Sequence, residues 1–282
     1  MRTEVTASMV KTLRERTGVG MAKCKEALDE AHGDIEAAID ILRKAGAASA
    51  VKKSSRETNE GLIGSKENAQ GIALVQVNAE TDFVIKNDKF LSFVETLTED
   101  ALVQGASSLE SFMEQKTKAG VSHEDMRVEL VQTIGENIQV RKVQVLPKKA
   151  NSSYGLYRHL GGKIVTYVEI AGSNKMDVLA KDVAMHIAAE APEYLKEDEI
   201  PEEVIAREKD IASSQLKGKP SEMVEKILVG KMKAHAMQVC LLDQKFIKDT
   251  NVSIEQHVEA EGKKAGVKLE VVKFLRWEVG AS

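Results

Sequence analysis

The sequence predicts an α+β protein built from more than one packed unit. Its 282 residues exceed what a single hydrophobic core usually organises. Strand-type and helix-type apolar patterns follow each other in the order strand, helix, helix, strand, and this order occurs twice along the chain. Apolar residues make up 43% of the chain and aromatic residues only 4%, so Ala, Val, Ile and Leu must fill the cores. This composition is typical of folded proteins, not of disordered chains.

Changes of pattern along the chain divide it into four segments. The first segment lacks strand patterns, and the second shows no regular spacing of apolar residues. Each of the last two segments contains the order strand, helix, helix, strand. The expected segments are a three-helix head (1–47), a linker (48–60), a first α+β unit (61–147) and a related second α+β unit (148–282) with an inserted helical hairpin at about 192–235.

Three short amphipathic helices are predicted in the head. Apolar residues recur at three- and four-residue spacing after Thr6, from Met21 and after Asp34. Gly18-Val19-Gly20 is a tight connection, and Gly46 is expected to end the third helix. The compact triplet with this turn resembles a ubiquitin-associated-type domain, a fold used for docking. Met21 is therefore either a docking residue or a core residue, and its spacing favours the core.

The linker collects positive charge. Lys52, Lys53 and Arg56 stand close together in a segment without apolar periodicity. Such a cluster is usually a solvated tether, although it can also lie along an acidic partner surface. The whole chain has a formal net charge of −4, so it has no global attraction for nucleic acid. An RNA-binding accessory factor is one alternative for the function, but the sequence lacks the aromatic stacking motifs that such proteins use.

The first unit is organised around a strand and the polar corner that follows it. Ile72–Val77 is apolar on nearly every position, which predicts a strand covered on both faces. Thr81 and Asp82 are good N-cap residues, so the chain is expected to turn from strand to helix there. Phe83 stands beside this corner, where it can either pack down or point outward.

Caps and alternating patterns predict the other elements. In the first unit they are a helix capped by Asp88, a helix over 108–118, a helix that begins at Ser122 and a strand over 138–146; in the second they are strands over 164–170 and 269–279 and helices over 176–190 and 254–265, the last broken at Gly262. Two similar amphipathic helices flank Gly218-Lys219-Pro220 and predict an antiparallel coiled-coil hairpin. This hairpin either projects as an arm or folds flat on its own core.

No catalytic, cofactor or metal site is predicted. The six histidines lack ligand spacing, and neither a phosphate-binding loop nor a serine nucleophile elbow is present. Cys24 and Cys240 belong to no Cys-x-x-Cys pair, and both are expected to be buried thiols. The N-terminus carries no apolar leader and the chain no long apolar run, which favours a cytoplasmic protein without a membrane partner.

Residues 78–84, Asn-Ala-Glu-Thr-Asp-Phe-Val, closely resemble a signature of the bacterial elongation factor Ts family. Members of this family are guanine-nucleotide exchange factors for elongation factor Tu. Ala79 stands where the family often has Cys, a change with little expected effect on the corner. The similarity extends over nearly the whole chain, through further segments in the family's order: 13–28, 33–38, 134–138, 184–189, 218–220 and 230–232.

The resemblance implies a translation elongation factor that binds elongation factor Tu in its GDP-bound and nucleotide-free states and is not an enzyme. The corner Thr81, Asp82, Phe83 and Val84 would reach the GTPase domain. Phe83 would enter an apolar pocket between two helices, displace magnesium and the phosphate loop, and so promote GDP release until GTP binds. Matching positions imply secondary partner contacts at Met21, Lys52, Ile134, Gly135, His159 and Ile247.

A second function class stays open at this point. The head and the hairpin by themselves favour a non-catalytic, ubiquitin-associated-like scaffold or adaptor protein. A homodimer through the hairpin or the second unit is also compatible with the sequence. Release of a labelled GDP from elongation factor Tu separates the exchange factor from the adaptor, since an adaptor leaves that rate unchanged.

Overall fold

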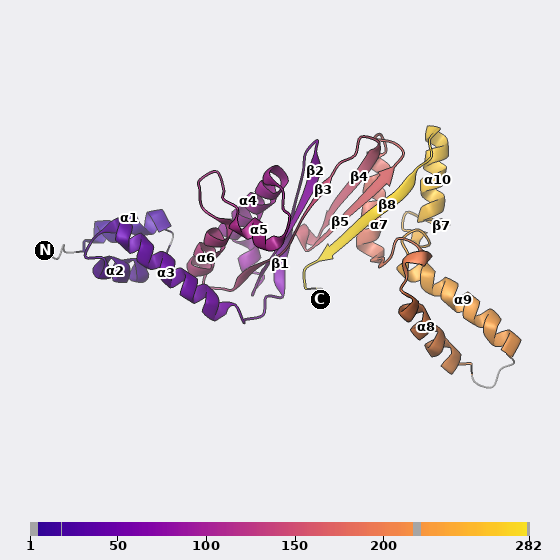
Figure 1. Cartoon of the computed structure of the whole chain (residues 1–282), viewed down its shortest axis with the longest axis horizontal. Helices are drawn as coiled ribbons and strands as arrows, with labels where there is room; N and C mark the ends of the chain where they lie inside the picture. The colour runs from indigo at the N-terminus through magenta and orange to yellow at the C-terminus, as the bar shows by residue number, and fades with distance from the viewer. Residues whose placement is uncertain (1–4, 18, 217–220, 281–282) are drawn as a thin grey trace. The chain divides into compact units, whose positions relative to one another are not determined.

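The computed structural model describes residues 5–17, 19–216 and 221–280, and it contains both helices and small β-sheets (Figure 1). This mixture confirms the predicted α+β class. The chain divides into two compact units, Met1–Lys148 together with Glu278–Ser282, and Lys149–Trp277. Among the described residues, no helix combines the length and the apolarity needed to cross a membrane.

The N-terminal part of the first unit is a cluster of three helices, α1 (Ala7–Thr17), α2 (Met21–Glu30) and α3 (Ile35–Lys53). Leu13 and Leu28 are fully buried among them, on the apolar faces that the three- and four-residue spacing predicts. These helices therefore share a small core of their own.

The third helix is longer than the sequence predicts. Asp34 caps its first turn and accepts a backbone hydrogen bond of 3.0 Å, as expected. The expected end at Gly46 is wrong, because α3 continues through this residue to Lys53. A Cβ at Gly46 would lie 2.7 Å from Oε1 of Gln132, so glycine lets α3 pack closely against the later helix α6 (His123–Ile134). This packing offsets the cost of about 1 kcal/mol that glycine imposes inside a helix.

An antiparallel sheet forms the centre of the first unit. Its strands lie in the order β1 (Glu60–Glu67), β2 (Gly71–Ala79) and β3 (Ile138–Pro147). Every residue of β2 is buried, as its two-sided apolar pattern predicts. The pattern does not predict β1, which contains the poor strand former Gly64. Glycine is required there because a Cβ would lie only 2.1 Å from Oγ1 of Thr98.

Helices α4 (Asp88–Gln104), α5 (Leu109–Glu114) and α6 lie together on one side of this sheet (Figure 1). The helix expected over 108–118 is shorter than predicted, because α5 ends at Glu114 and Lys116 forms an isolated β-bridge with Ser122. A short 3₁₀ helix, η1 (Val84–Lys86), precedes α4. Apolar side chains of β2, η1, α4 and α6 pack into one continuous core. The end of β2 is thus anchored in this core on both sides of the corner.

The second unit contains a sheet of its own. Its strands lie in the order β4 (Ser152–His159), β5 (Ile164–Ala171) and β8 (Glu270–Glu278), and α7 (Asp177–Glu190) packs against β4 and β5. This unit also contains η2 (Leu160–Gly162), η3 (Glu197–Glu199), β6 (Lys245–Phe246), β7 (Asp249–Ser253) and the helix α10 (Ile254–Ala265). The sequence pattern does not predict β4, β6 or β7.

Gly262 does not break α10, which corrects the prediction of an interrupted helix. This glycine is buried, and a Cβ there would lie 2.8 Å from the carbonyl oxygen of Val267. The chain turns back tightly after α10, so the position requires a residue without a side chain.

Two further helices of the second unit, α8 (Glu202–Ser214) and α9 (Ser221–Val239), lie side by side. Ile205, Leu228 and Met232 line a groove of about 770 Å³ along the pair. The predicted connection Gly218-Lys219-Pro220 lies outside the described residues.

Candidate functional site

The corner after β2 exposes one aromatic side chain to solvent, directly before two buried residues. Phe83 is 80% exposed, whereas Val84 and Ile85 are each only 6% exposed. Backbone hydrogen bonds from the Lys86 N–H to the Phe83 carbonyl (3.3 Å) and from the Asn87 N–H to the Val84 carbonyl (2.9 Å) close the turn. The side chain of Phe83 therefore points outward, which decides the alternative that the sequence leaves open.

The capping prediction at this corner is wrong. Thr81 and Asp82 do not cap a helix. The short helix η1 comes before α4, and Phe83 occupies the N-cap position of η1. The cap of α4 is Asn87 instead of the expected Asp88, and Asn87 accepts a hydrogen bond of 2.9 Å from the Lys89 N–H. Local cap preferences do not reveal this extra turn, because it places Val84 and Ile85 in the core of the whole unit.

Thr81 is held by an acidic side chain from a distant part of the sequence. Its backbone N–H donates to Oε2 of Glu136 (3.1 Å), and its hydroxyl donates to Oε1 of the same carboxylate (2.7 Å). The last pair of the β2–β3 ladder joins Ala79 with Ile138, which brings the segment before β3 beside the corner. Both hydrogen bonds involve a charged acceptor, the stronger class of protein hydrogen bond.

A second carboxylate makes the reciprocal contact. Glu80 accepts a hydrogen bond of 2.5 Å from the Asn137 N–H and lies 3.3 Å from the guanidinium of Arg56. The side chain of Asn137 is fully buried and donates to the carbonyl oxygen of Arg56 (2.8 Å). Three segments that are distant in the sequence, around residues 56, 80 and 136, therefore meet at this corner.

These contacts change the interpretation of the linker. Residues up to Lys53 continue α3, and Arg56, whose side chain is 53% exposed, pairs with Glu80 at the corner. Burial lowers the pKa of Lys53, and the charges of Lys23 and Arg56 lower it further, whereas Glu80 opposes this shift. Lys52 is exposed, so its side chain is accessible to a partner.

Asp82 forms an exposed pair with Lys86. Its Oδ2 atom lies 3.0 Å from the Lys86 Nζ atom, and the two side chains are 48% and 70% exposed. An exposed pair four residues apart contributes little to stability, about 0.3–0.5 kcal/mol. Asp82 is thus accessible beside Phe83.

Ile134 and Gly135 also lie at this corner. Ile134 is half-buried against the first core, and Gly135 ends α6 in the left-handed conformation with φ of 93°. Gly135 is exposed and leads directly into Glu136. The structure therefore brings together Thr81, Asp82, Phe83, Val84, Ile134 and Gly135.

The other predicted contact residues are not part of this cluster. Met21 lies in the head and is 52% exposed, so the core position that its spacing favours is wrong. His159 and Ile247 belong to the second unit. His159 is exposed and Ile247 is 37% exposed, with the Ile247 N–H donating to Nδ1 of the buried His186 (3.3 Å).

Sequence reasoning missed the residues that hold the corner in place. Glu80, Glu136, Asn137 and Arg56 carry no local signal, because each acts across a large sequence separation. The β2–β3 register brings Glu136 and Asn137 beside Glu80, and the pairing of Glu60 with Ala79 at the start of β1 brings Arg56 to the same end of the sheet. Glu136 and Asn137 do lie in a segment that resembles the family, 134–138, but the resemblance assigns them no role.

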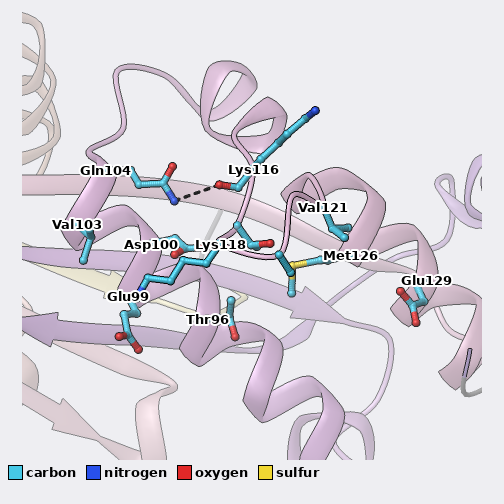
Figure 2. Close-up of a pocket in the computed structure, with 12 residues that line it drawn as sticks. Thr96, Glu99, Asp100, Val103, Gln104, Lys116, Lys118, Val121, Met126 and Glu129 are labelled. Atoms are coloured by element: carbon cyan, nitrogen blue, oxygen red, sulfur yellow. Dashed lines mark hydrogen bonds between the residues drawn. The ribbon is translucent and has the colours of Figure 1, made fainter. Parts of the chain in front are cut away.

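A groove of about 690 Å³ elsewhere in the first unit contains none of the predicted site residues. Figure 2 shows its lining from α4, α6 and the segment between α5 and α6, including Glu99, Lys118 and Met126. Gln104 donates a hydrogen bond to the Lys116 carbonyl across it (3.3 Å), the dashed line of Figure 2. The groove mixes acidic, basic and apolar side chains without one dominant chemistry.

The two cysteines lie in different parts of the chain, Cys24 in α2 and Cys240 directly after α9. Cys24 and Cys240 are both buried free thiols, as predicted. Burial raises the pKa of the Cys240 thiol to about 12, and nearby acidic groups add to this shift. No group of three or more potential metal ligands occurs within residues 5–17, 19–216 and 221–280.

Comparisons with known proteins match nearly the whole chain. The sequence model of the family Elongation factor TS matches residues 80–281. Elongation factor Ts of Protochlamydia amoebophila (strain UWE25) is 53% identical over 278 residues, covering 98% of this chain and 99% of that protein. Elongation factor Ts of Chlamydia muridarum (strain MoPn / Nigg) is 44% identical over 274 residues, covering 96% and 97% of the two chains. The chain therefore belongs to the elongation factor Ts family of translation elongation factors, which are nucleotide exchange factors and not enzymes.

Proposed function

We propose that this chain binds elongation factor Tu in its GDP-bound state and promotes release of GDP by inserting the corner Asp82-Phe83 into the GTPase domain. It then holds the nucleotide-free state until GTP binds. The observation that supports this proposal most directly is the 80% exposure of Phe83, directly before the two buried apolar residues Val84 and Ile85. Residues in this position are available for a partner without any rearrangement of their own fold.

An exposed phenylalanine has an energetic cost that a binding role explains. Burying a side chain of this size contributes about 1.5–3 kcal/mol, which the isolated protein forgoes at Phe83. Aromatic residues that fill a pocket of the partner often dominate the binding energy of an interface. Phe83 therefore acts as the apolar wedge of the proposed interface, and Asp82 makes polar contacts beside it.

Exchange follows from linkage between two binding equilibria. A factor that binds the nucleotide-free GTPase more tightly than the GDP-bound form must weaken GDP binding by the same ratio. Typical coupling free energies are about 1–3 kcal/mol. The chain itself makes and breaks no covalent bond in this scheme.

The proposed partner surface extends beyond the corner. Thr81 and Val84 hold the wedge in place, and Ile134 and Gly135 flank it. We also propose secondary contacts at Met21, Lys52, His159 and Ile247, whose side chains are all at least partly exposed.

The proposed architecture assigns a role to each part of the chain. The head (1–47) acts as a ubiquitin-associated-like docking domain, with α3 continuing into the linker (48–60). Residues 61–147 and 148–282 act as two related α+β core units, and α8 and α9 form a coiled-coil arm inserted at about 192–235. A homodimer through this arm or the second unit is an additional proposal that light scattering tests. Action on elongation factor Tu would place the protein in the cytoplasm.

Release of a fluorescently labelled GDP from elongation factor Tu tests the proposed function. Substoichiometric amounts of this chain should accelerate release many-fold, because each molecule acts repeatedly. An unchanged release rate at stoichiometric protein contradicts the proposal. Binding to elongation factor Tu without acceleration would instead favour the alternative of a non-catalytic adaptor.

A further inference from the structure

We propose that Glu136 is the positioning residue that aims Phe83, an inference that rests on the proposed exchange function. Glu136 accepts two hydrogen bonds from Thr81, one from its backbone N–H (3.1 Å) and one from its hydroxyl (2.7 Å). Thr81 precedes Phe83 by two residues. Among the hydrogen bonds of the described residues, no interaction with a sequence neighbour holds both the N–H and the hydroxyl of Thr81.

The position of Glu136 at the end of the sheet explains why a side chain is needed there. The β2–β3 ladder ends with the pair Ala79 and Ile138, after which the two strands no longer pair. Glu136 and Glu80 each supply an acceptor to a backbone N–H of the opposite segment, at Thr81 and at Asn137. The two carboxylates therefore extend the connection between the strands past the last backbone pair.

Phe83 depends on its neighbours for its direction. Because its ring is 80% exposed, it has little packing of its own to define its position. On its C-terminal side, the buried side chains of Val84 and Ile85 anchor the chain in the core. On its N-terminal side, the bonds from Thr81 to Glu136 provide the corresponding anchor. A side chain that is already oriented before binding loses less conformational freedom in the complex.

A double-mutant cycle distinguishes positioning from direct contact. In the wild-type background, Glu136→Ala should lower the rate of GDP release at a given concentration of the factor by about tenfold. A tenfold change corresponds to about 1.4 kcal/mol. In a Phe83→Ala background the same substitution should lower the rate less than about twofold, since no wedge is left to aim. Equal losses in both backgrounds would overturn the proposal.

The conservative variant supplies a second readout. In Glu136→Gln, the amide oxygen can accept from the Thr81 N–H while the amide nitrogen donates to the Thr81 hydroxyl. Exchange by Glu136→Gln should therefore stay within about threefold of wild type, the difference reflecting the lost charge of the acceptor. Glu67→Ala is the matched control, because this carboxylate binds Lys148 (2.8 Å) at the opposite end of the same sheet. The control should exchange GDP at the wild-type rate.

Amide hydrogen exchange keeps this inference separate from the proposed function. Deuterium uptake by the segment 80–87 should rise in Glu136→Ala and stay near wild type in Glu136→Gln, without elongation factor Tu present. Unchanged uptake in Glu136→Ala would overturn the positioning role. A wild-type protein that fails to accelerate GDP release contradicts the proposed function, whereas the uptake result still decides whether Glu136 orders the corner.

Discussion

The two units each contain a central strand that leads into a helix, and the two corners differ in what they expose. In the first unit β2 leads through residues 80–87 to α4, and in the second β5 leads through 172–176 to α7. The first corner exposes Phe83 within the connection itself. The second connection is mainly polar, and the exposed apolar residue nearby is Val178, 79% exposed in the first turn of α7.

The corners also differ in how they are held. At the second corner Gly172 adopts a φ of 108°, and a Cβ there would lie 2.0 Å from the Lys268 carbonyl oxygen. Its N–H donates to the Asn151 carbonyl (2.9 Å), so backbone fit defines this turn. At the first corner the carboxylates of Glu80 and Glu136 hold the chain. The comparison indicates that the second turn serves its own fold, whereas the first orients a side chain that its own fold does not bury.

The largest expected effect is a loss of stability at the second corner. Gly172→Ala should lower the free energy of unfolding of the second unit by about 3 kcal/mol, because it adds both strain and a backbone collision. Urea denaturation measures the change. Gly161→Ala is the matched control, since its φ is 69° but its Cβ would face open space, and it should cost about 1 kcal/mol. Equal costs for the two variants would contradict the role of close packing at Gly172.

At the first corner the largest expected effect concerns exchange. Phe83→Ala should slow GDP release from elongation factor Tu by about 30-fold, the loss expected for an interface residue worth about 2 kcal/mol. Its melting temperature should hardly change, because the ring is exposed. Val178→Ala, which removes the exposed apolar side chain beside the second corner, should leave exchange unchanged. A large fall in melting temperature for Phe83→Ala would show that the ring supports the core.

A pH dependence should appear in the second unit. Burial lowers the pKa of His186, opposed by its hydrogen bond with Gln244 and by Glu190. The unfolded chain therefore binds a proton near pH 6.5 that the folded chain rejects, so stability falls as the pH drops below 6.5, by at most about 1.4 kcal/mol per pH unit. Urea unfolding followed by the fluorescence of Trp277, the single tryptophan, measures this dependence.

Substitution of the same side chain tests that assignment. His186→Gln should flatten the dependence of stability on pH, because the titrating group is removed. His32→Gln, at an exposed position of the head, should leave it unchanged. A pH dependence that persists in His186→Gln would assign the effect to other groups.

The smallest expected effect concerns the exposed pair at the first corner. Lys86→Ala should change the free energy of unfolding by less than about 0.5 kcal/mol, since the Lys86–Asp82 pair is largely solvated. Thermal unfolding checks this expectation. A clear loss of exchange in this stable variant would sharpen the comparison, because it would extend the functional surface of the first corner to Lys86.

Particular residues show how much of the candidate site could be predicted. The apolar pattern of Ile72–Val77 predicts a strand that is buried on both faces, and the structure shows this burial. Asp34 and Ser122 cap the helices that the sequence predicts. The same local logic fails at Thr81 and Asp82, where a short 3₁₀ helix delays α4. It also fails at Gly46, where contact with Gln132 outweighs the poor helix propensity of glycine.

The sequence by itself determined the α+β class, the place of the corner and the family to which the chain belongs, because apolar periodicity, caps and motifs are local properties. Tertiary structure alone decided that Phe83 points outward and that Glu136 holds Thr81 from 55 residues away. The physical reason is that strand register determines which distant side chains meet, and register follows from packing of the whole unit.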